Sequence, residues 1–159
     1  MYEPKEDSFL LKEQVKKYAK NKTVLDIGSG SGIQAETAIK SGAKNVLATD
    51  IKDYIIKYLK NKSIKAIRSN LFSALKNKKF DLIIFNPPYL PEDKREDRKS
   101  KVSTTGGKRG DEIILRSLKQ TKNYLSKEGV ILIVISSLTP QHRITKLLTQ
   151  QSQPTSFGQ

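Results

Sequence analysis

The sequence predicts an α/β fold with a doubly wound, mostly parallel sheet that carries helices on both faces. Short apolar runs rich in β-branched residues alternate along the chain with stretches of helical periodicity. A glycine-rich turn and an Asn-Pro-Pro-Tyr tetrapeptide each follow such a run, and ligands of open α/β sheets bind beyond the carboxyl ends of strands. The 159 residues suffice for one domain, expected at 1–149, with a polar, disordered tail over 150–159.

The first part of the chain predicts a helix followed by three strands. The helix begins near Glu6, where Asp7 or Ser8 can cap it. Its apolar side is expected to carry Phe9, Leu10, Val15 and Tyr18. The strands are expected at residues 23–27, 45–50 and 64–68. A helix that ends near Gly42 connects the first pair, and a helix over about 54–60 precedes the third strand.

The second part predicts two more strands on either side of a long charged segment. The largely apolar runs at 80–85 and 130–135 are typical of buried strands. Residues 91–110 lack apolar periodicity, and we interpret them as a mobile loop that covers a substrate or simply links its neighbours. Helices are expected at 111–125 and after Pro140.

A glycine-rich turn follows the first predicted strand. Gly28, Gly30 and Gly32 come just after Asp26, and glycine permits positive φ and close approach of a ligand to the backbone. The spacing differs from the G-x-G-x-x-G of dinucleotide sites, and the turn lacks the Gly-Lys-Ser/Thr of a P-loop. Asp50, at the end of the second strand, can accept hydrogen bonds from both ribose hydroxyls. The turn and Asp50 together fit an adenosine ligand, although Asp50 alone could merely cap the next helix.

The tetrapeptide Asn86-Pro87-Pro88-Tyr89 follows the strand predicted at 80–85. The Asn86 side-chain oxygen and the Pro87 carbonyl can accept the two hydrogens of a planar NH2 group. Pro87 and Pro88 have fixed φ and stiffen the arrangement, while Tyr89 offers a flat face to a planar substrate. The four residues favour methyl transfer to an amide or ring amine, although Asn-Pro also simply ends strands.

Composition excludes several classes of protein. With no cysteine and His142 as the single histidine, we expect no disulfide, no thiol nucleophile and no metal centre. The absence of a long apolar stretch or a signal peptide predicts a cytoplasmic protein with no membrane contact. The net charge of +14 favours a polyanionic partner such as RNA. The lysines are spread along the chain, however, and can equally form an ordinary solvated surface.

Four ordered motifs resemble those of HemK-like protein glutamine N5-methyltransferases of the archaeal and eukaryotic release-factor type. The motifs are YEPKEDSFLL at 2–11, DIGSGSG at 26–32, NPPY at 86–89 and GGKRGDE at 106–112, and the match extends to about Leu148. The resemblance implies a class I, Rossmann-like methyltransferase fold that uses S-adenosylmethionine. It also implies methylation of the glutamine in a Gly-Gly-Gln motif of a translation release factor.

The resemblance also implies roles for individual residues. It places the following residues at the cofactor: Ser8, Asp26, Gly28, Gly30, Asp50, Asn70 and Leu71. Asn86 would bridge cofactor and substrate, with Tyr2 and Pro4 close to the cofactor. Threonine is frequent where Ser8 stands and aspartate where Asn70 stands, but each replacement keeps an oxygen that accepts hydrogen bonds.

Folds of this class normally end with two further strands that form an antiparallel edge. Residues 150–159 cannot form them, so the C-terminal strand pair is expected to be missing and the strand at 130–135 to be an exposed edge. We therefore expect a shortened member of the family that is marginally soluble alone. In this family a small zinc-binding activator protein adds near the third strand, and such a partner is expected here.

Two other functions remain open. Adenine N6 methylation of DNA or RNA could use the same tetrapeptide, but it is not favoured because the chain has no additional segment to recognise a flipped base. A cofactor-binding scaffold without activity is the second alternative, and the intact Asn86 argues against it. Methyl incorporation into a Gly-Gly-Gln protein and into adenine oligonucleotides distinguishes the three.

Overall fold

The computed structural model describes residues 3–88, 108, 110–137 and 139–152. The chain forms two compact units. The first comprises Met1–Pro87 and Thr121–Val134, and the second comprises Pro88–Gln120 and Ile135–Gln159. Within the described residues, no helix is both long and apolar enough to cross a membrane.

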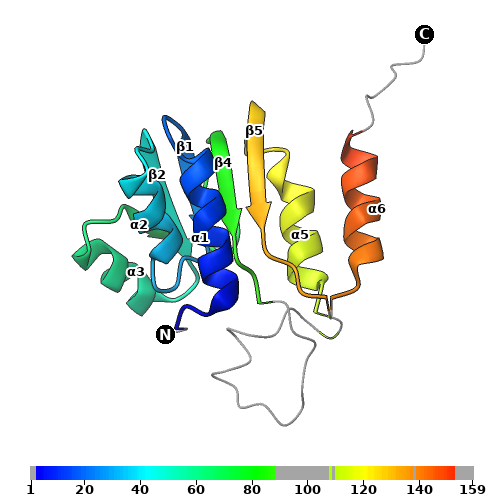
Figure 1. Ribbon diagram of the computed structural model, residues 1–159, viewed down its shortest axis with the longest axis horizontal. Coiled ribbons are helices and arrows are strands. Elements are labelled where there is room, and N and C mark those ends of the chain that lie inside the picture. The colour runs from blue at the N-terminus through cyan, green and yellow to red at the C-terminus, as the bar shows by residue number, and fades with distance from the viewer. Residues whose placement is uncertain (1–2, 89–107, 109, 138, 153–159) are drawn as a thin grey trace. The chain divides into compact units, whose positions relative to one another are not determined.

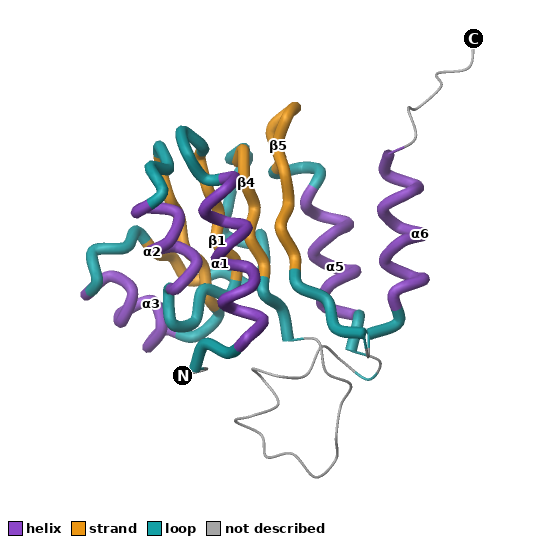
Figure 2. Tube along the Cα trace, viewed as in Figure 1, coloured by secondary structure: helices purple, strands orange, loops and turns teal. Residues whose placement is uncertain are grey.

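The first unit is built on a five-stranded sheet in the order β3-β2-β1-β4-β5 (Figures 1 and 2). The strands are β1 (Thr23–Ile27), β2 (Asn45–Asp50), β3 (Ala66–Arg68), β4 (Phe80–Phe85) and β5 (Leu125–Ile133). All four neighbouring pairs are parallel, which confirms the predicted α/β class. Because every strand runs the same way, their carboxyl ends meet at one edge of the sheet and their amino ends at the other.

The predicted bounds of β1, β2 and β4 are correct, whereas β5 begins earlier than predicted. Leu125, which was expected to end a helix, pairs with Phe80 instead. The register between β4 and β5 then shifts, and Gly129 lies at this irregularity. A Cβ atom at Gly129 would approach the Phe80 carbonyl oxygen to 3.0 Å and Leu125 Cγ to 2.7 Å, so the bulge requires glycine there.

Helices α1 (Glu6–Tyr18), α2 (Ile33–Lys40) and α3 (Asp53–Asn61) belong to the same unit. The expected apolar side of α1 is wrong for three of its four residues, because Phe9, Leu10 and Tyr18 are exposed and only Val15 is buried. The buried side consists of Ser8, Leu11 and Val15, followed by Ala19 at the C-cap. The continuous apolar run at 9–11 hides this spacing in the sequence. The cap prediction was also wrong, since Lys5 is the N-cap and makes no side-chain cap bond.

Both faces of the central strands are buried. On one face, Val24, Leu82 and Ile84 pack with the buried side of α1 and with Ala38 of α2. Ala48 and Ala66 lie on the same face under Ile55, Ile56 and Leu59 of α3. Alternate residues such as Leu25, Ile83 and Phe85 point the other way and are also buried. Burial on both faces explains why these strands read as continuous apolar runs.

The second unit holds α5 (Glu112–Thr121) and α6 (Gln141–Ser152). Asp111, just before α5, is fully buried and forms an ion pair of 2.8 Å with Arg143 of α6. Helix α6 continues to Ser152, so the predicted start of a polar tail at residue 150 lies inside this helix. Residues 153–159 lie outside the described part of the chain. The loop predicted at 91–110 also falls almost entirely outside it.

Candidate functional site

The glycine turn after β1 has the backbone geometry that the sequence predicts. Gly28, Gly30 and Gly32 have φ values of +65°, +50° and +80°. A Cβ atom at Gly28 would contact Phe85 at 3.7 Å and one at Gly30 would contact the Gly28 carbonyl oxygen at 3.9 Å, so the positive φ, and not crowding, favours glycine at these two positions. Gly32 differs, because a Cβ there would come within 2.7 Å of Leu59 in α3. The first two glycines supply the left-handed backbone of the turn, while the third also allows close packing against α3.

Asp26 is buried in β1, directly before this turn. Its carboxylate accepts a hydrogen bond from the backbone N–H of Ala35 at 3.2 Å. Burial raises the pKa of Asp26 from 3.8 to about 7, and the charge of Asp50 adds to the rise. The groups that oppose it, the Ser29 hydroxyl and the Ala35 N–H, are neutral. A cation placed at this carboxylate would therefore be strongly favoured.

Asp50 ends β2 and joins it to the glycine turn. One carboxylate oxygen accepts from the Gly30 N–H at 3.2 Å, and the other accepts from the Lys52 N–H at 3.0 Å. The bond to Lys52, the N-cap of α3, shows that Asp50 helps to start that helix. Each carboxylate oxygen has a second acceptor position, so this structural role is compatible with binding hydroxyl groups.

Asn70 and Leu71 follow β3 at the same edge of the sheet. The Ser69 N–H donates to the Asp50 carbonyl at 2.9 Å, which places this segment beside the end of β2. Leu71 has a φ of +51°, a left-handed conformation that is uncommon for a branched apolar residue. The Ser69 hydroxyl donates to the Leu71 carbonyl at 2.8 Å and holds it there. Such backbone strain commonly marks a ligand site.

Asn86 follows β4 and contacts the first turn of α1. Its side-chain nitrogen donates to the Asp7 carboxylate and to the Ser8 hydroxyl, each at 3.3 Å. Two acceptors around one end of the amide place the NH2 group there and turn the oxygen away. That oxygen is buried and finds no hydrogen-bond partner among the described residues. Asn86 therefore has an oriented acceptor oxygen whose hydrogen-bonding capacity is not used by the described residues.

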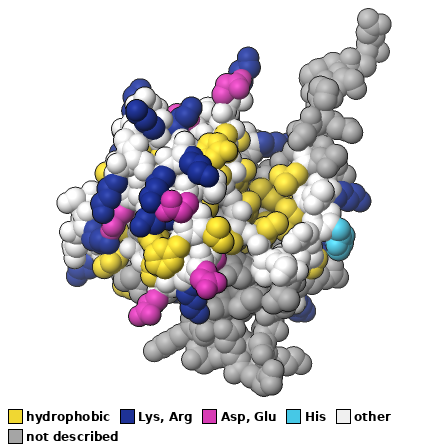
Figure 3. Space-filling model, in the orientation of Figure 1, with side chains coloured by type: hydrophobic (Ala, Val, Ile, Leu, Met, Phe, Trp, Pro, Cys, Tyr) yellow, Lys and Arg dark blue, Asp and Glu magenta, His cyan; other side chains and the backbone are white. Residues whose placement is uncertain are grey.

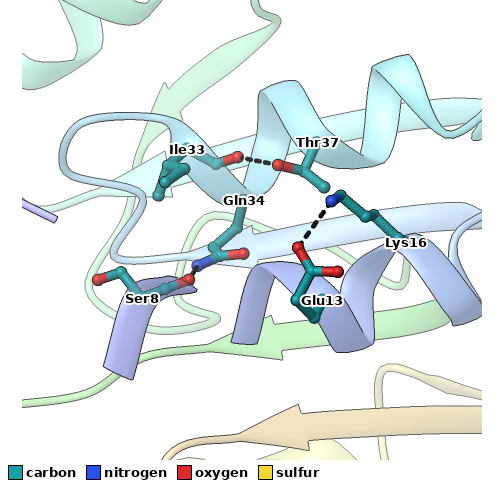
Figure 4. Close-up of polar contacts among 6 residues, drawn as sticks. All are labelled: Ser8, Glu13, Lys16, Ile33, Gln34 and Thr37. Atoms are coloured by element: carbon teal, nitrogen blue, oxygen red, sulfur yellow. Dashed lines mark hydrogen bonds and ion pairs between the residues drawn. The ribbon is translucent and has the colours of Figure 1, made fainter. Parts of the chain in front are cut away.

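Gln34 fixes the position of the first turn of α1 (Figure 4). This residue lies in the first turn of α2, is buried, and donates from its amide nitrogen to the Ser8 carbonyl at 2.8 Å. In the same view, Thr37 bonds back to Ile33 within α2. The sequence interpretation did not assign a site role to Asp7 or Gln34. Asp7 is 79 positions from Asn86 in the sequence. The sequence signal for a site role of Asp7 was therefore limited to its position next to Ser8.

Only some of the other predicted site residues lie in the described part of the chain. Pro87 is buried at the end of the first unit, and Pro88 belongs to the second. Tyr89 and Tyr2 lie outside the described residues, and Pro4 is half-buried before α1. The remaining predicted residues, from Ser8 to Leu71, lie with Asn86 at the carboxyl edge of one sheet, and their roles in binding stay a prediction.

This edge fits S-adenosylmethionine. The glycine turn has no side chains at Gly28, Gly30 and Gly32 to keep a ligand from its backbone, Asp50 has unused acceptor positions, and Asp26 provides a buried carboxylate. A parallel sheet of this order is Rossmann-like, and it is similar to the sheet of a solved methyltransferase structure, which assigns the class I methyltransferase fold. Sequence comparison agrees, because residues 5–156 match the family described as Methyltransferase small domain. The chain belongs to that family, in its HemK-like branch, and its cofactor is S-adenosylmethionine.

Individual relatives support this assignment. A Methanocaldococcus jannaschii protein, whose name provisionally assigns it protein N5-glutamine methylation, is 43% identical over 87% of this chain and 74% of its own length. The catalytic subunit mtq2 of the Schizosaccharomyces pombe eRF1 methyltransferase is 29% identical over 93% of this chain and 78% of its own. The crystal structure of a Lactobacillus delbrueckii ribosomal protein L11 methylase is similar, with a TM-score of 0.71 and 28% identity, over 94% of this chain and 70% of that one.

Proposed function

We propose that this methyltransferase methylates the side-chain amide of a glutamine, and that the glutamine lies in the Gly-Gly-Gln motif of a translation release factor. The proposal is supported by the names of relatives, which include protein N5-glutamine, eRF1 and release factor glutamine methyltransferases. A ribosomal protein uL3 glutamine methyltransferase is also among them, so ribosomal proteins form a second substrate class to test.

The observation that carries the proposal is the oriented oxygen of Asn86. A glutamine amide nitrogen is a poor nucleophile because its lone pair is delocalised into the carbonyl. An acceptor that holds one N–H fixes the nitrogen and draws electron density toward it, and the buried Asn86 oxygen is such an acceptor. The Pro87 carbonyl would take the other N–H, and the Tyr89 ring would face the amide plane.

The cofactor is proposed to lie along the carboxyl edge. Asp50 would accept from the ribose hydroxyls, and Gly28 and Gly30 would let the ligand approach the turn. Asp26 would face a positively charged group, and the segment Asn70-Leu71 would contact the base. Ser8 would line the same space beside Asn86. When bound, S-adenosylmethionine supplies an electrophilic methyl group and leaves as S-adenosylhomocysteine.

The reaction does not require a strong general base from the protein. The amide nitrogen becomes strongly acidic as it gains the methyl group, so its proton can pass to water or to a nearby carboxylate. The protein accelerates the reaction chiefly by holding the amide in line with the methyl group and by accepting its N–H bonds. Asp7 acts through Asn86 as a positioning residue, because its carboxylate holds the amide nitrogen of Asn86.

The test is incorporation of a labelled methyl group. Three substrates are compared: a release factor with its Gly-Gly-Gln motif, the same protein with that glutamine changed to alanine, and adenine-containing RNA and DNA. We expect label only in the first, with N5-methylglutamine identified by mass spectrometry. Label in the oligonucleotides alone would assign adenine methylation instead. No incorporation into any of the three, while the protein binds cofactor, would support an inactive scaffold.

A small zinc-binding activator is the proposed protein partner. The strand β3 pairs with β2 and with no other described strand, so its outer edge is free to receive a partner. At the other end of the sheet, the side chains of β5 are only partly buried, which leaves a second edge. Co-expression followed by light scattering tests this proposal. A monodisperse, fully active monomer without a partner would contradict it.

A further inference from the structure

Exposed lysines mark the start of every strand in the sheet. A lysine directly precedes β1, β2, β3 and β4, and another lies three positions before β5. These residues are Lys22, Lys44, Lys65, Lys79 and Lys122. Because all strands are parallel, these positions share one edge of the sheet, opposite the functional site. Lys20, Lys76, Lys78 and Lys127 are exposed beside the same strand ends. We name this set the lysine edge.

Hydrogen bonds hold the strand starts beside one another. The N–H of Lys44 donates to the Lys22 carbonyl at 2.8 Å, and the N–H of Phe80 donates to the Tyr124 carbonyl at 2.8 Å. Asp81, in β4, joins the two halves, since its carboxylate accepts from the Thr23 N–H and from the Ser126 hydroxyl. Across five strands spaced by about 4.8 Å, the lysines form a row on the order of 20 Å long.

Few acidic groups neutralise this row. Asp81 uses its oxygens for the bonds just described, and the charges of Lys22 and Lys44 help to lower its pKa. Glu128 is exposed next to Lys127 and is one acidic group at this edge. The opposite edge has a different character, with Asp26 and Asp50 at the ends of their strands. Figure 3 shows Lys and Arg side chains over the left part of one face, with Asp and Glu side chains among them.

We propose that the lysine edge binds structured RNA through its phosphate backbone. Lysines are mobile point charges that contact phosphates without reading sequence. Tyr124, beside the row, is stacked on Phe72, so this aromatic ring is already engaged and is not a platform for an unpaired base. A row of charges without such a platform suits a duplex better than a single strand. The choice of RNA rests on the proposed function, because the translation apparatus is built on RNA.

The bound RNA is a docking partner and not a substrate. A strand of six residues such as β4 is about 20 Å long, so the lysine edge and Asn86 lie at opposite ends of the sheet. RNA held at one edge leaves the other free for a protein substrate. The lysine edge would therefore bring the enzyme to an RNA-containing assembly and point its site away from the RNA.

The test is binding of a labelled 20-base-pair RNA duplex, followed by fluorescence anisotropy between roughly 50 and 200 mM salt. The variant K22Q/K44Q/K79Q is compared with the control K12Q/K57Q/K146Q, which removes the same charge from the middles of three helices. We expect the edge variant to bind the RNA duplex at least about tenfold more weakly. The slope of log K, where K is the association constant, against log salt concentration should become shallower by roughly 2 to 3. The control should change affinity less than about threefold.

Three outcomes would overturn the proposal. The first is equal weakening by the edge and control variants, which would mean that net charge alone attracts RNA. The second is equal or tighter binding of a DNA duplex, and the third is binding of polyglutamate with no binding of RNA. Circular dichroism of both variants shows that they are folded. Because the assay needs no methyl transfer, its failure is distinguishable from failure of the proposed glutamine activity.

Discussion

The two ends of the sheet shift the pKa of a buried or half-buried aspartate in opposite directions. At the carboxyl end, burial raises the pKa of Asp26 to about 7. At the amino end, the Thr23 N–H and the Ser126 hydroxyl lower the pKa of Asp81. One carboxylate is poorly compensated within the protein, and the other is satisfied by its neighbours.

The difference shows where stability was given up for function. A weakly compensated carboxylate, a strained Leu71 and a buried amide oxygen without a described partner all lie at the carboxyl end. Each is unfavourable in the protein alone, and the proposed ligands would supply partners for the carboxylate and the amide oxygen. The amino end holds its strands together with fully used hydrogen bonds.

The largest effect is expected for Asn86→Ala. The change deletes the acceptor aimed at the substrate amide, and turnover should fall by roughly 100-fold or more while cofactor affinity stays within a few-fold. Steady-state kinetics and calorimetry measure the two quantities. Asn45→Ala makes the same substitution at the exposed start of β2 and should leave both unchanged. Turnover of Asn86→Ala within about threefold of the parent would remove Asn86 from the proposed mechanism.

The next effect is expected for Asp50→Ala. Loss of a charged acceptor should weaken S-adenosylmethionine binding by about 1.5 to 3 kcal/mol. Calorimetric titration of the folded variant gives the value directly. Because Asp50 also bonds to Gly30 and Lys52, thermal melting should show a smaller loss of stability. Unchanged affinity would place the ribose elsewhere.

Asp26→Asn is expected to stabilise the cofactor-free protein at high pH. The folded pKa of Asp26 is raised, so between pH 3.8 and about 7 the folded state keeps a proton that the unfolded state has released. The stability of the parent therefore falls as pH rises through this window, and asparagine cannot ionise. We expect the variant to be about 4 kcal/mol more stable at pH 8, with the difference closing toward pH 4. Urea unfolding at several pH values measures this, and a pH-independent difference would contradict it.

The smallest effect is expected for Asp81→Ala. Loss of the bonds to Thr23 and Ser126 should lower stability by about 1 kcal/mol at pH 7. Since the folded pKa of Asp81 lies below its ordinary value, this contribution is present at neutral pH and lost as pH falls below about 4. Urea unfolding at pH 7 and pH 3 checks both points. The control Asp53→Ala breaks an exposed ion pair with Arg68 and should change stability by under about 0.5 kcal/mol.

Local signals made most of the fold predictable. The bounds of β1 and β4 and the positive φ values of the glycine turn follow from apolar runs and glycine positions within a few residues. The start of β5 was missed because the polar stretch at 126–128 interrupts its pattern. The contact between Asp7 and Asn86 was missed because only the tertiary fold brings them together.

The connection from β4 to β5 has a consequence for how such enzymes diversify. It leaves the sheet at Asn86 and returns at Leu125, so chain added after Asn86 enters at the functional edge. The pairing of β4 with β5 fixes the register on both sides of the connection. Doubling the length of a flexible loop costs only about 0.6 kcal/mol in closure entropy. Evolution can therefore lengthen or rewrite the chain after Asn86 without rebuilding the sheet that positions the Asn86 amide.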